Sequence, residues 1–281
     1  RTMCESREYQ YVLPVYALRR AAVAVDETGE RLGDSAGAEA RRREEGLTAE
    51  ERARLLSYLQ QLEGTHYFHN FTDHKLTCKD KQAQRYLLSA RVVDVPPLNG
   101  TACVSLCYHG QSFLLHQIRK MTSVVVGCMR GDLPPDALGV ALSTPSLRSG
   151  IPLAPACALT LRRCFFPRYE KWYGERGSIH FERCAAAQDE FLHQRIYPYL
   201  AEQEAAGAFR EFTESLERFR LEPRPPRADV EDSAGTADGD AVGRASDPSA
   251  DSGADGGTVG PDVGDEATLS LASDGAPCDA R

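Results

Sequence analysis

The sequence predicts an α+β fold in which helices flank an antiparallel sheet. Three observations support this prediction: strand-like runs rich in Val, Leu and Tyr, amphipathic runs with helical spacing, and an irregular order of the two kinds along the chain. Regular alternation of strands and helices would instead indicate a parallel sheet. We expect the folded part to cover residues 1–221 and an acidic tail to cover residues 222–281.

The boundary at residue 221 is predicted from composition and charge. The last 60 residues contain no Phe, Tyr or Trp, so they lack the apolar surface that would offset the entropy of ordering them. They hold 14 of the 41 acidic residues and 4 of the 33 basic ones, which leaves 29 basic against 27 acidic residues before them. The net charge of −8 therefore belongs to the predicted disordered tail, and the folded part is close to neutral.

The amino-terminal part predicts a strand, an insertion and a helix. Residues 7–18 are rich in Tyr, Val and Leu and predict a strand, with Pro14 at a bend or an edge. Residues 26–46 are polar, lack aromatic side chains and predict a flexible insertion. Thr48 and Glu51 form a capping box, and leucines on one stripe follow before Gly64.

The remaining elements follow from turn residues and periodicity. Residues 85–95 and 101–109 predict a β-hairpin across Pro-Pro-Leu-Asn-Gly. Residues 113–130 predict a long apolar helix that ends at Gly131, and a second helix is expected to start at Pro134 and Pro135. Residues 159–166 predict a returning strand, and residues 189–221 predict two amphipathic helices around Pro198.

Charge and cysteine content narrow the class of protein. Residues 66–130 contain eight Lys or Arg, three Asp and five of the seven histidines, a local excess of basic charge that suits a phosphate backbone or, equally, a solvated charged face. Nine cysteines without a paired C-x-x-C indicate a reducing compartment. Cys103 and Cys107 lie four residues apart on a predicted strand, which separates them by roughly 13 Å. Two thiols so far apart cannot bind one metal ion, so we expect both to be core thiols. The sequence contains no run of 18 apolar residues, so no membrane-spanning helix is predicted.

Three segments resemble the eukaryotic, nuclear and mitochondrial branch of the TruA family of tRNA pseudouridine synthases. They are Cys-Glu-Ser-Arg-Glu-Tyr-Gln-Tyr at 4–11, Gly-Thr-His-Tyr-Phe-His-Asn-Phe-Thr at 64–72, and Gly-Gln-Ser-Phe-Leu-Leu-His-Gln-Ile-Arg-Lys-Met at 110–121. Residues 152–161 and 194–198 resemble further segments of that branch. The sequence departs from the pattern at Tyr67, where the branch usually has Asn, and at 156–158, where it lacks a glycine-containing turn.

The resemblance implies roles for two residues. Tyr9 would be the ring under an extruded uracil and a candidate for removing the proton from carbon-5; its structural alternative is an aromatic side chain packed within the sheet. Arg119 would be the ion-pair partner that keeps a nucleophilic aspartate ionised; its alternative is an arginine that reaches the surface from a core helix. We expect the two side chains to face a shared hollow.

The resemblance also implies contacts with RNA phosphates. The candidates are Lys75, Lys79, Arg85, Arg91 and Lys120, each of which could instead be ordinary solvated surface.

The family's nucleophile belongs to an R-T-D-x-G motif that lies several dozen residues before the R-x-Y-x-Y strand. That strand begins here six residues from the first residue, so we expect the nucleophile to lie upstream of this sequence and the chain alone to have no turnover. Among the visible aspartates, Asp73 is the one to test.

The expected activity is the isomerisation of uridine to pseudouridine in tRNA and in other RNA, without a cofactor, in the nucleus or the mitochondrion. The expected fold is most of the second half of such a synthase. One alternative is a non-catalytic RNA-binding relative that keeps the cleft. A second alternative is an interaction protein whose acidic tail recruits partners.

Overall fold

The computed structural model describes residues 4–20, 24–25, 31–32, 36–72 and 76–225. Residues 226–281, most of the predicted tail, lie outside the described residues, as do parts of the predicted insertion.

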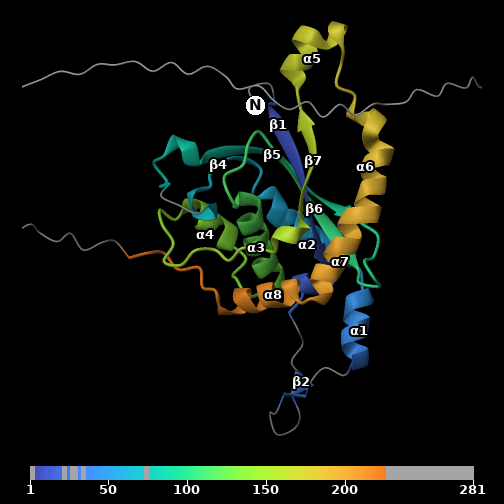
Figure 1. The fold of residues 1–281 in the computed structure, drawn as a ribbon. Coiled ribbons are helices and arrows are strands. Elements are labelled where there is room, and N and C mark those ends of the chain that lie inside the picture. Colours follow the sequence, from blue (N-terminus) through green and yellow to red (C-terminus); the bar gives the residue numbers. More distant parts are fainter. Residues whose placement is uncertain (1–3, 21–23, 26–30, 33–35, 73–75, 226–281) are drawn as a thin grey trace, which may run out of the picture. The chain divides into compact units, whose positions relative to one another are not determined.

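A five-stranded antiparallel sheet forms the centre of the fold, with strand order β4-β5-β6-β1-β7 (Figure 1). The strands are β1 (Ser6–Pro14), β4 (Gly64–Tyr67), β5 (Gln84–Asp94), β6 (Cys103–Gly110) and β7 (Leu159–Phe165). A separate two-stranded ribbon pairs β2 (Ala24–Val25) with β3 (Arg31–Leu32). The predicted α+β class is confirmed, because helices and an antiparallel sheet are mixed without regular alternation.

Eight α-helices accompany the sheet within the described residues. They are α1 (Ala36–Glu44), α2 (Ala49–Gln60), α3 (Gln117–Arg130), α4 (Ala137–Ser143), α5 (Pro167–Tyr173), α6 (Ala185–Phe191), α7 (Tyr197–Ala205) and α8 (Ala208–Arg218). Short 3-10 helices lie at Val15–Leu18, His69–Phe71, Lys81–Ala83, Ala156–Ala158, Gly174–Arg176 and Phe181–Cys184.

Strand β1 is shorter than predicted. It ends at Pro14, whose ring supplies no N–H for a ladder, and the chain continues as the 3-10 helix Val15–Leu18. The predicted hairpin is confirmed: β5 and β6 are antiparallel, and Asn99 and Gly100 have φ angles of 46° and 79° in the turn between them. Positive φ at both positions is the conformation for which Asn-Gly is preferred in hairpin turns.

Helix α2 has the predicted capping box. The Thr48 side chain accepts a hydrogen bond from the Glu51 amide, and the Glu51 carboxylate accepts one from the Thr48 amide. Leu55, Leu59 and Leu62 are fully buried, so this stripe packs toward the sheet as expected.

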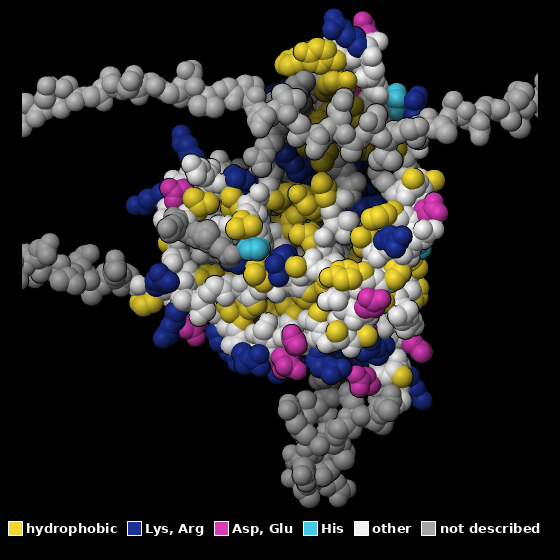
Figure 2. All heavy atoms as spheres, in the orientation of Figure 1, with side chains coloured by type: hydrophobic (Ala, Val, Ile, Leu, Met, Phe, Trp, Pro, Cys, Tyr) yellow, Lys and Arg dark blue, Asp and Glu magenta, His cyan; other side chains and the backbone are white. Residues whose placement is uncertain are grey.

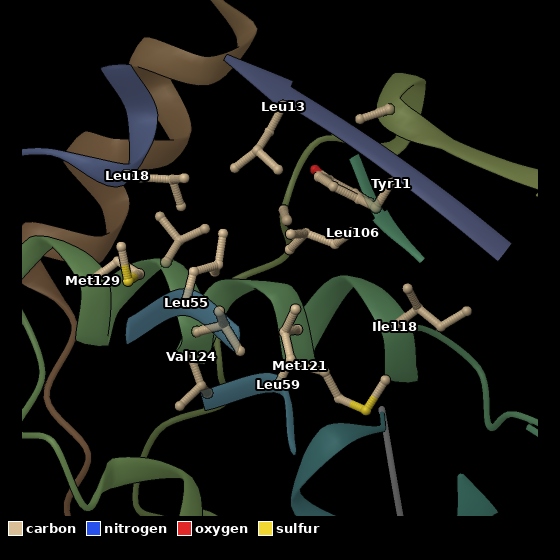
Figure 3. Packing of buried hydrophobic residues seen from close by; sticks show 14 of the residues in the cluster. Tyr11, Leu13, Leu18, Leu55, Leu59, Leu106, Ile118, Met121, Val124 and Met129 are labelled. Atoms are coloured by element: carbon tan, nitrogen blue, oxygen red, sulfur yellow. The ribbon is translucent and has the colours of Figure 1, made fainter. Parts of the chain in front are cut away.

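Helix α3 runs through the core. Tyr11 of β1, Leu106 of β6 and Met121 of α3 pack together between the sheet and the helix (Figure 3). The helix ends at Gly131, with φ of 76°, as predicted. It begins at Gln117 rather than at residue 113, because His116 adopts a left-handed conformation, with φ of 63°, that a helix cannot include.

Helix α1 lies within the predicted insertion. It occupies residues that we expected to be flexible, and Arg43 near its carboxy end forms an ion pair with the buried Glu204 of α7. A contact between residues so distant in sequence is not visible in local composition.

The carboxy-terminal helices differ from the prediction in two ways. Helices α6 and α7 continue into each other through a π-helical turn, Leu192–Ile196, and Pro198 lies in the first turn of α7, where its missing N–H costs little. The break falls instead at Gly207, with φ of 94°. The folded part also extends beyond the predicted boundary at residue 221. Arg148 N donates to Glu222 O at 2.8 Å, and Arg224 N donates to Ser146 O at 2.9 Å.

Candidate active site

Tyr9 lies on the central strand β1, on the sheet face that α3 covers. Alternation along the strand places it on the same face as Tyr11, which is fully buried against α3. The Tyr9 ring is half-buried and packs edge to face against Phe113, with ring centroids 5.3 Å apart. Leu161, its cross-strand neighbour on β7, is 49% exposed. Tyr9 therefore has an apolar setting that remains open on one side.

Arg119 is the exception in a buried helix. Of the 14 residues of α3 it alone is not buried. Its Nε donates a hydrogen bond to the carbonyl oxygen of Ala154 at 2.6 Å, and the guanidinium has no carboxylate partner among the residues that the structure describes. The hydroxyl of Tyr11 donates to the next carbonyl, that of Pro155, at 2.9 Å. Tyr9 and Arg119 thus lie on the same side of the sheet.

Burial is the main cause of the raised pKa values of Tyr9, Tyr11 and Cys157 in this region. Desolvation raises the pKa of Tyr9 above its ordinary value, and nearby Arg7 opposes that rise. Desolvation raises the pKa of Tyr11 far more, with Cys157 adding to the rise and Arg119 opposing it. The pKa of the Cys157 thiol is raised by burial and lowered by Arg119. Arg119 is therefore close enough to influence both groups.

The predicted RNA contacts of β5 and the loop before it differ in exposure. Lys79 is exposed, as a phosphate contact requires. Arg85 is half-buried, its Nη1 donates to the carbonyls of Gln82 and Gln84 at 2.6 and 2.7 Å, and burial lowers the pKa of its guanidinium. The Nε of Arg85 is buried without a partner in the described structure.

Of two further predicted contacts, one is buried and the other lies on the opposite face of the sheet. Lys120 is buried, and its Nζ donates to the carbonyl of Thr72 at 2.7 Å, so the ammonium is part of the core rather than of a phosphate-binding surface. Arg91 is exposed but forms an ion pair with Glu8, which alternation places on the sheet face opposite to Tyr9. Lys75 and Asp73 lie outside the described residues.

Hydrophobic side chains gather at the centre of one face of the molecule, between the positions of α3 and β7, with Lys and Arg side chains beside them (Figure 2). An apolar surface with basic residues at its margin suits a base and its phosphates.

The described residues offer neither a metal cluster nor a membrane span. No three His, Cys, Asp or Glu side chains within them are placed to hold a metal ion. Cys103 and Cys107 are buried free thiols on β6. No helix in this part of the chain is both long enough and apolar enough to cross a bilayer.

Sequence reasoning missed the residues that support the site. Phe113 lies in the motif at 110–121, and that motif does not reveal that its ring packs against Tyr9. The carbonyls of Ala154 and Pro155 carry no signal in the sequence. Strand alternation predicts that Tyr11 shares the face of Tyr9, but the bond of its hydroxyl to Pro155 is visible only in the structure.

Comparison with known proteins assigns these segments to a family. Residues 59–167 match the model of the tRNA pseudouridine synthase family. The chain is 38% identical over 186 residues to "tRNA pseudouridine synthase 1" of Yarrowia lipolytica, covering 64% of this chain and 35% of that protein. It is 32% identical over 200 residues to "Pseudouridylate synthase 1 homolog" of Homo sapiens, covering 69% and 42%. It is 41% identical over 111 residues to "tRNA pseudouridine(27/28) synthase" of Saccharomyces cerevisiae, covering 40% and 28%.

These matches identify the fold as a pseudouridine synthase domain. Its sheet carries Tyr9, and its buried helix α3 carries Arg119. The chain belongs to the tRNA pseudouridine synthase family, in the TruA class that its motifs indicated. It spans less than half the length of each of the three relatives described.

Proposed function

We propose that the gene product carrying this chain isomerises uridine to pseudouridine in tRNA, without a cofactor. The bond between ribose carbon-1′ and uracil nitrogen-1 breaks, the uracil rotates, and carbon-5 bonds to carbon-1′. The proton of carbon-5 is then released to water, and nitrogen-1 takes up a proton from water, so that product and substrate are isomers. The observation that carries the proposal is the placement of Tyr9 and Arg119 on one side of the sheet, in a chain that belongs to the family.

Arg119 is the proposed ion-pair partner of a nucleophilic aspartate. A carboxylate in a closed pocket loses hydration, which raises its pKa, whereas a guanidinium within about 4–6 Å lowers it. Because Nε is held by Ala154, the guanidinium is oriented before the carboxylate binds. Arg119 would therefore keep the nucleophile ionised at neutral pH.

Tyr9 supplies a flat ring beside an apolar, open surface. An extruded uracil is stabilised by stacking on such a ring, because the base has left the helix in which it was stacked before. The Tyr9 hydroxyl is protonated at neutral pH, since burial raises its pKa above the ordinary value near 10. It is a candidate for relaying the carbon-5 proton to water: the hydroxyl would pass its own proton to water and then accept the proton of carbon-5.

Lys79 and Arg85 are the proposed phosphate contacts among the described residues. Lys79 is exposed and Arg85 is half-buried. We also propose a nuclear or mitochondrial location, in keeping with the eukaryotic relatives. Microscopy of a fluorescent fusion of the gene product, with markers for both compartments, tests this location.

Release of tritium from tRNA labelled at carbon-5 of uridine tests the activity. We expect release by the gene product and a loss of at least about hundredfold in Tyr9→Phe, with unchanged tRNA affinity, because the ring stays and the acid–base group is removed. Tyr9→Leu should weaken tRNA binding as well. Binding of tRNA without any release of tritium by the unaltered protein would instead indicate a non-catalytic RNA-binding relative.

A further inference from the structure

Residues 159–191, from β7 through α6, are unusual for their exposure. None of these residues is buried, although they include seven aromatic side chains. Trp172, the one tryptophan of the sequence, is 61% exposed on α5, and Phe191 is 57% exposed. Contiguous exposed apolar surface marks binding sites, so this stretch is a place to look for one.

A cavity of about 450 Å³ lies in this stretch, between the end of β7 and the start of the 3-10 helix Phe181–Cys184. Phe166 and Phe181 line it with rings parallel to within 8° and centroids 6.2 Å apart. The Arg163 guanidinium lies over the rings of Phe165 and Phe181, at 4.9 and 5.6 Å from their centroids. Ser178 lines the same cavity and adds a polar group. Flat rings with a few polar groups form a site for a flat, polar-edged molecule.

The charge around the cavity is basic. Residues 162–183 contain six Lys or Arg and three Glu. The carboxylate of Glu182 is bound to Arg163 at 2.7 Å, and that of Glu170 accepts a hydrogen bond from Ile179 N at 2.7 Å. Lys171 and Arg176 have no ion pair among the residues that the structure describes. Basic side chains interleaved with aromatic rings complement a nucleic acid, whose phosphates and bases alternate.

This cavity is distinct from the candidate active site. Arg163 and Phe165 pair with Glu8 and Ser6 of β1, so they lie on the sheet face opposite to Tyr9. Most of the lining lies in residues 163–182, and the match to the family model ends at residue 167.

We propose that the Phe166–Phe181 cavity binds an unpaired base of RNA and so forms a second RNA contact outside the catalytic pocket. The base stacks against the Phe rings, and Lys171 and Arg176 contact the flanking phosphates. The choice of RNA as ligand rests on the proposed function.

Fluorescence anisotropy of the full 281-residue chain tests the proposal, with a labelled oligouridylate of about 10 nucleotides and an abasic ribose-phosphate oligomer of the same length as probes. We expect the oligouridylate to bind at least about fivefold more tightly, because one stack on an aromatic ring contributes ~1 kcal/mol or more. Phe181→Leu and Phe166→Leu should each remove most of that preference. Tyr199→Leu, at a 49% exposed ring of α7, is the matched control and should retain it.

The substituted residues are not buried, so the variants should keep the thermal unfolding midpoint of the parent chain. Photocrosslinking of an oligomer that carries 5-iodouridine gives a readout that needs no variant. Crosslinks to Phe166 or Phe181 would support the proposal. Equal affinity of parent and Phe181→Leu, or crosslinks confined to the Tyr9 region, would overturn it. The two proposals can fail separately. If Phe181→Leu loses the base preference but the gene product releases no tritium, the proposed RNA site is supported and only the proposed activity is refuted.

Discussion

Tyr11 and Arg119 hold the same short segment: the Tyr11 hydroxyl donates to Pro155 O at 2.9 Å, and Arg119 Nε donates to the preceding carbonyl, that of Ala154, at 2.6 Å. The first residue belongs to the central strand, the second to the central helix, and the segment leads into the edge strand β7. The two hydrogen bonds therefore connect β1, which carries Tyr9, and α3 to the segment that precedes β7. The catalytic geometry proposed here depends on this connection.

Removal of the Tyr11 hydroxyl should destabilise the fold. In Tyr11→Phe the carbonyl of Pro155 loses its donor in a partly buried setting, and we expect a loss of about 1–2 kcal/mol in the free energy of unfolding. Urea denaturation measures it. The control is Tyr58→Phe, because Tyr58 is also buried but its hydroxyl has no hydrogen bond among the described residues. Equal losses in the two variants would show that the bond to Pro155 adds no stability.

Replacement of Arg119 by lysine should impair catalysis more than binding. Lysine keeps the charge, but its single ammonium cannot bond to Ala154 and still present two further nitrogens to a carboxylate. In the gene product we expect tritium release to fall by about hundredfold, a typical effect of losing a positioned charge-stabilising group, while tRNA affinity changes little. Arg148→Lys, at a side chain that is 70% exposed, should release tritium at the parental rate. Parental activity in Arg119→Lys would remove Arg119 from the mechanism.

Local patterns predicted the elements of this fold well. Strands β1, β5, β6 and β7, the Asn-Gly hairpin and the Thr48–Glu51 capping box depend on neighbouring residues, so the sequence alone predicted them, whereas the short strand β4 was not predicted. Features that depend on distant partners were missed. Lys120 looked like a surface cation until its contact with the carbonyl of Thr72 was known. Helix α1 was expected to be flexible because its partner, Glu204, lies in α7.

The candidate site likewise combines features that local sequence predicts with features that only the tertiary structure reveals. Tyr9 and Arg119 were selected because motifs surround them, and motifs are contiguous in sequence. The carbonyls of Ala154 and Pro155 carry no chemical label, and only the tertiary structure brings them to the two side chains. Sheet face is set by strand position: Arg91 is basic and exposed, and it lies on the face opposite to Tyr9.

Gly110 is needed for the close approach of Phe113. A Cβ at Gly110 would lie 2.9 Å from the Phe113 ring and 3.1 Å from the backbone oxygen of Tyr86. Gly110→Ala should therefore move Phe113 away from Tyr9 and cost about 1–3 kcal/mol of unfolding free energy. Calorimetry measures the stability, and tRNA affinity should fall with it.

Gly139→Ala is the matched control for that substitution. Gly139 lies in the exposed part of α4, and no atom comes within 4 Å of the position that a Cβ would take there, so alanine should stabilise the helix by about 0.5–1 kcal/mol. Destabilisation by both substitutions would contradict the assignment of the Gly110 effect to Phe113.

Glu51 should make stability depend on pH in the acid range. The Arg19 side chain, at 2.7 Å, is the main reason that the pKa of Glu51 falls to about 2 from an ordinary value of 4.5, and the Thr48 amide adds to the effect. Between these values the unfolded chain binds more protons than the folded one, so the stabilisation is present above about pH 4.5 and is lost as pH falls toward 2. Urea midpoints at about pH 6 and about pH 3 should therefore differ more in the parent than in Glu51→Gln. Glu50→Gln, in the same helical turn and without an ion pair among the described residues, should behave like the parent. An equal acid shift in the parent and Glu51→Gln would exclude the Arg19–Glu51 pair as a source of the pH dependence.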